Sequence, residues 1–257
     1  MFKLPNIPNY LGGNKQPIGW SVSLTDLENT YFLDAVSDKP KKVVAQKLVA
    51  GGITYCPAFA GYYKNVFAIK MPFTIILNKL DGKLSAESSP NISMDKKHIV
   101  RIDKDDLGYN VQILLNNLFV SDKPYTTIET MPPILHGCKE EIVYLNGKFD
   151  IHAWQRPLHF GFRIDQSVFE KLDHDTSIIF DKGSIVQYVR INTPDDKSVT
   201  LHQFSPDDLK EVSMFVNRNT GLNSKLHLMN YKEIWNRVRY RRPKKFLRDL
   251  NYGSKSN

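Results

Sequence analysis

Between residues 53 and 203 the hydrophobic pattern has the short period of β-strands. Runs rich in Val, Ile, Phe, Tyr and Thr recur there, and several alternate apolar with polar residues. These runs are VFAIK, FTIIL, HIVRID, YNVQILL, LFVS, TIET, IVYL, FDIHAW, SIIF, IVQYVRI and SVTLHQ. Turn sequences such as LDGK, SDKP, LNGK and FDKG separate them and leave no room for helical crossovers. We therefore predict a mainly β fold, either an antiparallel β-sandwich or a barrel-like domain.

The pattern differs before this region. Residues 1–20 are rich in Pro, Gly and Asn and have no apolar period, so we expect an arm there. Residues 26–36 fit a short helix or a strand, and neither alternative is excluded. The segment 37–48 favours a short helix with Pro40 in its first turn.

After residue 203 the apolar period becomes helical. Ser205 is an expected N-cap of a first helix, and a second helix is expected from about Ser224 to Arg242, before Pro243. The pattern therefore divides the chain into three parts. These are an N-terminal arm and short helix (1–50), a β-rich domain (51–203), and C-terminal helices with a basic tail (204–257).

Composition narrows the class of protein. A chain of 257 residues with 41% hydrophobic and 11% aromatic residues is typical of a soluble globular protein. No window approaches the roughly eighteen continuous apolar residues of a membrane helix, and the N-terminus has no apolar core of a secretory signal. The two cysteines, Cys56 and Cys138, lack CxxC spacing, so we interpret them as reduced thiols in a cytosolic protein. We expect no membrane association.

The positive charge is concentrated near the C-terminus. The segment 232–249 holds eight basic and two acidic residues, which is six of the formal net charge of +8. Such a cluster around Trp235 and Tyr240 predicts salt-sensitive nucleic-acid binding. The alternative is a solvated helix end whose basic residues complement the helix dipole. The candidate nucleic-acid-binding residues are Arg237, Arg239, Arg241, Arg242, Lys244 and Lys245.

The stretch YLNGKFDIHAWQRPLHFGFRID, residues 144–165, gathers the side chains best suited to acid–base chemistry. On a strand, Asp150, His152 and Trp154 would point to one face. The alternative is the ordinary polar face of a half-buried strand. The candidate catalytic residues are Asp150, His152, Arg156 and His159. The candidate ligand-binding residues, expected to converge with them in a pocket, are Tyr144, Trp154 and Gln187.

Other chemistry has weaker support in the sequence. The histidines lack the local spacing of a metal site, so we expect no metal. No nucleophile elbow, Walker-type loop or dinucleotide fingerprint occurs, and we expect no cofactor. Four aromatic residues could suggest a ligand platform, but we interpret them as packing residues. They are Trp20, Tyr62, Tyr63 and Phe67.

Three sequence blocks resemble an uncharacterised protein family of marine tailed phages, the cyanophages and their relatives. The blocks are YCPAFAGYYKNVFAIKMPFTIIL, NGKFDIHAWQRPLHFGFRID and FDKGSIVQYVRI. The expected final helix, NYKEIWNRVRYRRPKKF, is also similar to this family in its Tyr, Trp and Arg content. The resemblance implies a phage-encoded protein made in the host cytoplasm, with the virion as a second expected location. It supplies no activity and no functional residue.

A second similarity concerns the fold. An Asp-containing strand followed by G-x-x-x-Q is similar to the β-clip nucleotide hydrolases related to dUTPase. That similarity implies a catalytic role for Asp150, with Gly183 and Gln187 on the later strand. Trp154 stands where a sugar-stacking tyrosine is expected, and the serine-containing phosphate motif is missing.

These observations leave three hypotheses. The first is a non-catalytic structural, assembly or binding protein that associates with itself or with other phage proteins. The second is a small-molecule enzyme, with a nucleotide as the candidate substrate. The third is nucleic-acid binding through the basic C-terminal helix.

Overall fold

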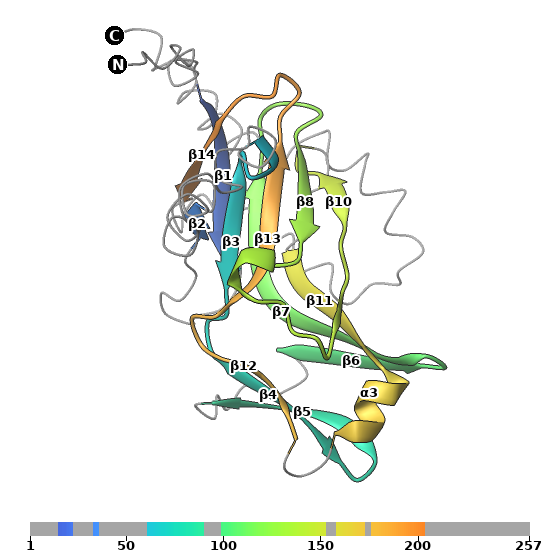
Figure 1. The fold of residues 1–257 in the computed structure, drawn as a ribbon. Coiled ribbons are helices and arrows are strands. Elements are labelled where there is room, and N and C mark those ends of the chain that lie inside the picture. The colour runs from blue at the N-terminus through green and yellow to red at the C-terminus, as the bar shows by residue number, and fades with distance from the viewer. Residues whose placement is uncertain are drawn as a thin grey trace, which may run out of the picture.

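The computed structural model describes residues 15–22, 33–35, 61–89, 99–152, 158–172 and 176–203 (Figure 1). In these residues the fold is mainly β, with little helix, and the strands form three sheets, none of which closes into a barrel. The prediction of a mainly β fold is therefore confirmed. The expected arm before residue 15, the short helix at 37–48 and the C-terminal helices lie outside the described residues.

The largest sheet has six strands in the order β14–β1–β7–β11–β9, with β6 also paired to β7. Its strands are β1 (Gln16–Val22), β6 (Val100–Asp105), β7 (Gly108–Val120), β9 (Val143–Tyr144), β11 (Leu158–Asp165) and β14 (Val199–Gln203). β1 and β14 run parallel, with Gln16 beside Val199, whereas the other pairs are antiparallel. β1 therefore joins the start of the described chain to its end.

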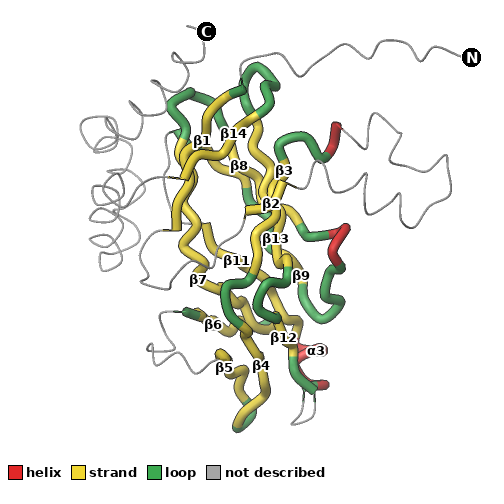
Figure 2. Tube along the Cα trace, turned by 90° about the vertical axis from the view of Figure 1, so that its left-hand side faces the viewer, coloured by secondary structure: helices red, strands yellow, loops and turns green. Residues whose placement is uncertain are grey.

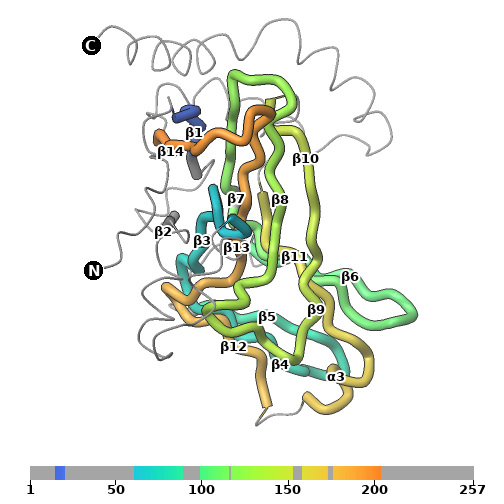
Figure 3. The backbone as a smooth tube through the Cα atoms, turned by 45° about the horizontal axis from the view of Figure 1, so that its top comes forward, coloured from blue at the N-terminus to red at the C-terminus, as the bar shows by residue number. Residues whose placement is uncertain are grey.

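The second sheet has five antiparallel strands in the order β10–β8–β13–β3–β2. They are β2 (Leu33–Ala35), β3 (Val66–Lys70), β8 (Thr127–Met131), β10 (Lys148–Asp150) and β13 (Ile185–Asn192). β8 and β10 lie side by side in Figures 1 and 3, beside the long β13.

The third sheet has three strands, β12 (Ile178–Phe180), β4 (Thr74–Leu80) and β5 (Lys83–Ser89). It lies at the lower end of the molecule with β6 and α3 (Figures 1 and 2). The paired strands β3 and β13 continue into it as β4 and β12. Hydrogen bonds between Met71 and the segment Gly183–Ser184 keep the ribbon paired at the bend. The β4–β5 hairpin turns at Asp81 and Gly82, both with positive φ, as a two-residue Asp-Gly turn requires.

One hydrophobic core joins the three sheets. It takes Ile18 and Phe160 from the six-stranded sheet, Ile128 and Ile191 from the five-stranded sheet, and Leu77 from the three-stranded sheet. β11 shows how the pattern directs this burial. Its residues 158, 160, 162 and 164 are buried in the core, and the residues between them point to the other face.

A smaller cluster lies on the opposite face of the five-stranded sheet. It contains Tyr63, Val66, Ala68, Met131 and Tyr188. The 3-10 helix η3 (Ile134–His136) contributes Leu135 to it. The helix α3 (Gln166–Lys171) packs elsewhere, with the ring of Phe169 4.5 Å from that of Tyr109.

Several strands coincide with the predicted runs, and two were missed. The run VFAIK is β3, and IVQYVRI is β13 with one further residue. β1 lies where the sequence predicted an arm, and its Ile18 is fully buried. β5 was missed because KLSAESS is polar, as suits the edge strand of a small sheet. The parallel pairing of β1 with β14 also departs from the expected all-antiparallel arrangement.

Candidate functional site

The predicted catalytic stretch does not continue as one strand. β10 ends at Asp150, and Ile151 and His152 form a turn, so the expectation that Asp150 and His152 share one strand face is wrong. The Asp150 carboxylate accepts a hydrogen bond from the backbone N–H of His152 at 2.7 Å. This contact ends the strand, because an Asp side chain readily bonds a backbone donor two residues later. Trp154 and Arg156 lie outside the described residues.

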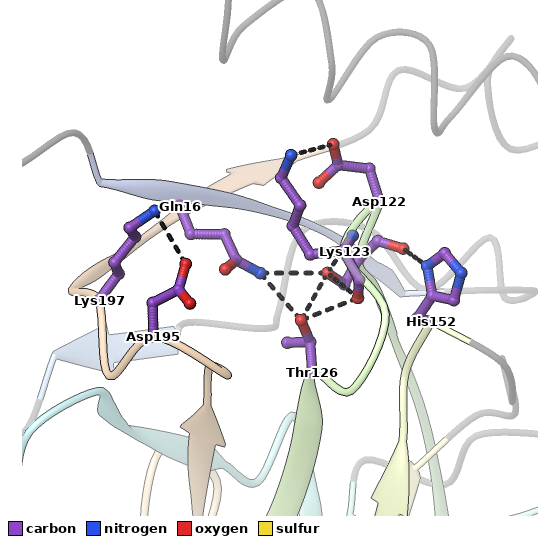
Figure 4. A network of polar contacts seen from close by, with 8 residues as sticks. Gln16, Asp122, Lys123, Thr126, His152, Asp195 and Lys197 are labelled. Carbon is purple, nitrogen blue, oxygen red and sulfur yellow. Dashed lines mark hydrogen bonds and ion pairs between the residues drawn. The ribbon is translucent and has the colours of Figure 1, made fainter.

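His152 contacts the connection between β7 and β8. Its Nδ1 atom lies 3.2 Å from the backbone carbonyl oxygen of Ser121. Figure 4 shows this ring beside a polar network in which the Gln16 amide donates to the hydroxyls of Ser121 and Thr126. The contacts of Asp150 and His152 therefore support the chain connections at one end of the two larger sheets.

The other described candidates lie on different strands and faces. His159 points to the face of β11 opposite the core, whereas Tyr144 on β9 points toward the core with its ring 5.9 Å from that of Phe160. Gln187 is buried on β13, and its Oε1 atom has no hydrogen-bond partner among the described residues. Among these candidates the structure brings together only Asp150 and His152. The catalytic set, of which Arg156 is not described, stays a prediction.

The electrostatics of His159 are unusual. Burial, with a smaller contribution from the positive charge of Arg101, lowers the pKa of His159 to about 4. The imidazole is therefore neutral at pH 7. Burial also raises the pKa of the Tyr144 hydroxyl, which accepts a hydrogen bond from the backbone N–H of Lys139 at 3.2 Å.

A second group of titratable side chains surrounds η3. The Tyr188 hydroxyl is hydrogen-bonded to Nδ1 of His136 and also accepts the backbone N–H of Leu135. Burial raises the pKa of Tyr188 well above its usual value, so the phenol stays neutral. These bonds fasten η3 to the five-stranded sheet. No group of three His, Cys, Asp or Glu residues in the described parts of the chain could hold a metal ion.

A hollow with a volume of about 300 Å³ lies where the chain enters β3 and leaves β13. That volume is at the lower end for small-molecule sites. Most of the lining is polar or charged. The lining residues are Gly61, Tyr62, Lys64, Asn65, Arg190, Ile191, Asn192, Thr193 and Asp196.

Two turns form the walls of the hollow and are fastened to each other. The Lys64 ammonium bonds the backbone carbonyl and the carboxylate of Asp196, at 2.8 Å for the latter. The Asn65 amide donates to the Lys197 carbonyl at 2.8 Å, and its oxygen accepts the Val199 N–H at 3.0 Å. Asn65 and Asp196 both have positive φ, which Asn and Asp tolerate better than other residues. The hollow is therefore bounded by hydrogen-bonded backbone.

Arg190 and Tyr62 form the aromatic side of the hollow. The Arg190 guanidinium carbon lies 4.2 Å from the centroid of the Tyr62 ring, a cation–π contact. The Arg190 Nη2 atom donates to the Tyr62 carbonyl at 2.7 Å, and Nη1 lies 3.6 Å from the Glu129 carboxylate. The Tyr62 ring packs edge-on against that of Tyr63, with 5.1 Å between the ring centroids, but Tyr62 remains 46% exposed. Its ring is accessible beside a fixed positive charge.

Two buried polar atoms lie next to this pair. Asn192 and Thr127 are opposite each other on β13 and β8, so their side chains share a sheet face. The Asn192 Nδ2 and Thr127 Oγ1 atoms are buried and have no hydrogen-bond partner among the described residues. Buried donors without a partner are uncommon and costly. Asn192 lines the hollow, so its buried amide lies in the wall of the hollow.

No local sequence pattern predicts this group of residues, for a physical reason. Lys64 and Asp196 are 132 positions apart, and no local pattern brings them together. One signal was present: Arg190 and Asn192 are alternate polar residues at the end of a buried strand. Such residues occupy one face, but the sequence does not identify what lies opposite that face.

Comparison with protein-family models, curated proteins and solved structures found no match to this chain. The resemblance to marine tailed-phage proteins and the similarity to nucleotide hydrolases therefore stay predictions. No helix within the described ranges has both the length and the apolar character needed to cross a membrane.

Proposed function

We propose that this chain is a non-catalytic phage protein that binds a partner and acts in particle structure or assembly. The observation that carries the proposal is the hollow between the two fastened turns. Its exposed Tyr62 ring and donor groups are held on hydrogen-bonded backbone. A preformed polar site of this kind loses little conformational entropy on binding.

We also propose that the chain forms a sandwich-like β domain with a C-terminal helical extension. The two larger sheets share one core, which supports a sandwich-like domain, and the sequence predicts a C-terminal helical extension beyond residue 203. Sheet domains with extended termini suit assembly, because terminal segments can pair with neighbouring copies. The proposed partners are other copies of this chain or other phage proteins, in the host cytoplasm or the virion.

Two measurements on the full-length chain test this function. Sedimentation velocity over a range of concentrations measures self-association, and mass spectrometry of purified particles measures incorporation. We expect the chain to self-associate, to be incorporated into particles, or both. Tyr62→Ala should weaken whichever of these is observed. Tyr125→Ala is the matched control, because Tyr125 is 78% exposed and lies outside the lining of the hollow. A chain that stays monomeric and is absent from particles would contradict the proposal.

Nucleic-acid binding is a second candidate, supported by the charge of segment 232–249. If Arg237, Arg239, Arg241, Arg242, Lys244 and Lys245 contact phosphates, affinity should fall steeply with salt. Fluorescence anisotropy with a labelled oligonucleotide at two salt concentrations measures this slope. Affinity that stays constant between them would remove the candidate.

A further inference from the structure

We propose that the hollow between the 61–65 and 193–196 turns binds a carboxylate group. This inference rests on the proposed binding function and names the chemistry that the site recognises.

Arg190 and Asn192 supply hydrogen-bond donors at the wall of the hollow. Arg190 carries five N–H donors, and its contacts in the structure are with the Tyr62 carbonyl, the Tyr62 ring and the Glu129 carboxylate. The Asn192 amide adds two donors on a buried nitrogen without a partner among the described residues. Both side chains point to the same face of β13, because they are two residues apart on a strand. A ligand with acceptor oxygens would bond the exposed part of Arg190, and a rotation of the Asn192 side chain would bring its amide to the same ligand.

The charge balance favours a singly charged oxyanion. Lys64 is paired with Asp196 at 2.8 Å, and Arg190 lies near Glu129 at 3.6 Å, so two cations already face two carboxylates. A phosphate dianion would enter a site with almost no net positive charge. A carboxylate carries a single negative charge, so less positive charge in the site is needed to balance it. Its two coplanar oxygens also match the paired N–H donors of a guanidinium.

Tyr62 indicates what the carboxylate would be attached to. Its half-exposed ring covers one side of Arg190 and offers an apolar surface to the carbon chain that carries the carboxylate. A glutamate or aspartate side chain of a partner protein has this form, and so does a free small acid. The chemistry of recognition is the same for both sources.

Titration of the full-length chain with three probes tests the inference. The probes are acetate, a blocked Ala-Glu-Ala peptide and inorganic phosphate. Binding is followed in the wild type and in every variant by the backbone amide NMR signals of residues 190–193. We expect saturable binding of acetate with a Kd on the order of 1 mM, as a four-atom ligand allows. A tighter peptide would identify a protein side chain as the natural source, and equal affinity would identify a free acid.

Matched variants connect binding to the hollow. Asn192→Asp keeps the side-chain shape but replaces donors with a negative charge, and acetate and peptide affinity should fall at least tenfold. Asn78→Asp makes the same change on β4 of the three-stranded sheet and should leave affinity unchanged. Circular dichroism checks folding. If Asn192→Asp does not fold, Arg190→Lys provides the test, because it keeps the charge and loses the planar fork, with an expected loss of about fivefold.

Three results would overturn the inference. They are no saturable binding of acetate or peptide, tighter binding of phosphate than of acetate, and unchanged affinity in the folded hollow variant. The proposed function has a separate readout. If particle incorporation still depends on Tyr62 while the carboxylate probes fail, partner binding stands and only the ligand class is wrong.

Discussion

The Gln16 side chain of β1 donates a hydrogen bond to the hydroxyl of Thr126, 110 positions later, at 3.0 Å. Both residues are buried, and the Ser121 hydroxyl lies within hydrogen-bond distance of each (Figure 4). The Thr126 hydroxyl also donates to the Lys123 carbonyl at 2.9 Å. This network fixes the β7–β8 connection against the first strand of the six-stranded sheet.

Removing the Thr126 hydroxyl should therefore destabilise the fold. Thr126→Val keeps the shape but leaves the buried Gln16 amide with one partner fewer, at an expected cost of about 1–3 kcal/mol. Urea denaturation measures the change in free energy of unfolding. Thr200→Val on β14 is the matched control and should cost less than about 0.5 kcal/mol. Equal losses for the two variants would show that the network contributes little.

Substitution of Asn117 on β7 should increase the stability of the fold, in contrast to the Thr126 variant. The residue is 1% exposed, and neither atom of its amide has a hydrogen-bond partner in the described parts of the chain. Asn117→Leu should raise the free energy of unfolding by about 1–2 kcal/mol, because it removes an unsatisfied buried polar group.

Asn110→Leu provides the comparison for Asn117. The Asn110 amide donates to the Asp105 carboxylate at 2.8 Å, so the same substitution there should lower stability. Differential scanning calorimetry of both variants gives the two signs. A loss of stability for Asn117→Leu would mean that overpacking outweighs the unsatisfied amide.

His159 predicts a loss of stability in mild acid. Its pKa is 6.5 when unperturbed and about 4 in the fold, so the unfolded chain binds the proton more readily between these values. The stabilisation is present above pH 6.5 and decreases as pH falls toward 4, by on the order of 1–3 kcal/mol. Chemical denaturation at several pH values measures this loss.

A variant assigns the pH dependence to one residue. His159→Gln should flatten the stability profile between pH 6.5 and 4, whereas His202→Gln on β14 should retain the wild-type slope. NMR titration of the His159 ring gives its pKa directly. A value near 6.5 would contradict the expected shift.

The Tyr188 hydroxyl provides a test of how much its hydrogen bonds to η3 stabilise the fold. Tyr188→Phe removes the hydroxyl that contacts His136 and accepts the Leu135 N–H. The expected loss is about 1–2 kcal/mol, with faster hydrogen exchange at residues 134–136. Tyr125→Phe, at an exposed position, should change neither quantity. Unchanged exchange in Tyr188→Phe would show that apolar packing alone holds η3.

Local sequence patterns account for the secondary structure of the central region. The alternation in LHFGFRID places Phe160 and Phe162 in the core, and the Asp81–Gly82 turn follows from residues that adopt positive φ. Both signals involve neighbours in the chain, so period and turn chemistry identify them. At β10 the alternation predicts a strand that is too long. The Asp150 side chain ends the strand two residues before the apolar and polar alternation stops.

The pairing of the strands and the position of the candidate site depend on contacts between residues far apart in the chain. Gln16 lies beside Val199 in a parallel pair, and Asn65 bonds the Lys197 carbonyl across 132 positions. Such contacts depend on loop closure and on the packing of whole sheets, and neither leaves a local pattern. Arg190 lies in a predicted strand run and Asn192 directly follows that run, but their position beside Tyr62 and Lys64 depends on the folded chain.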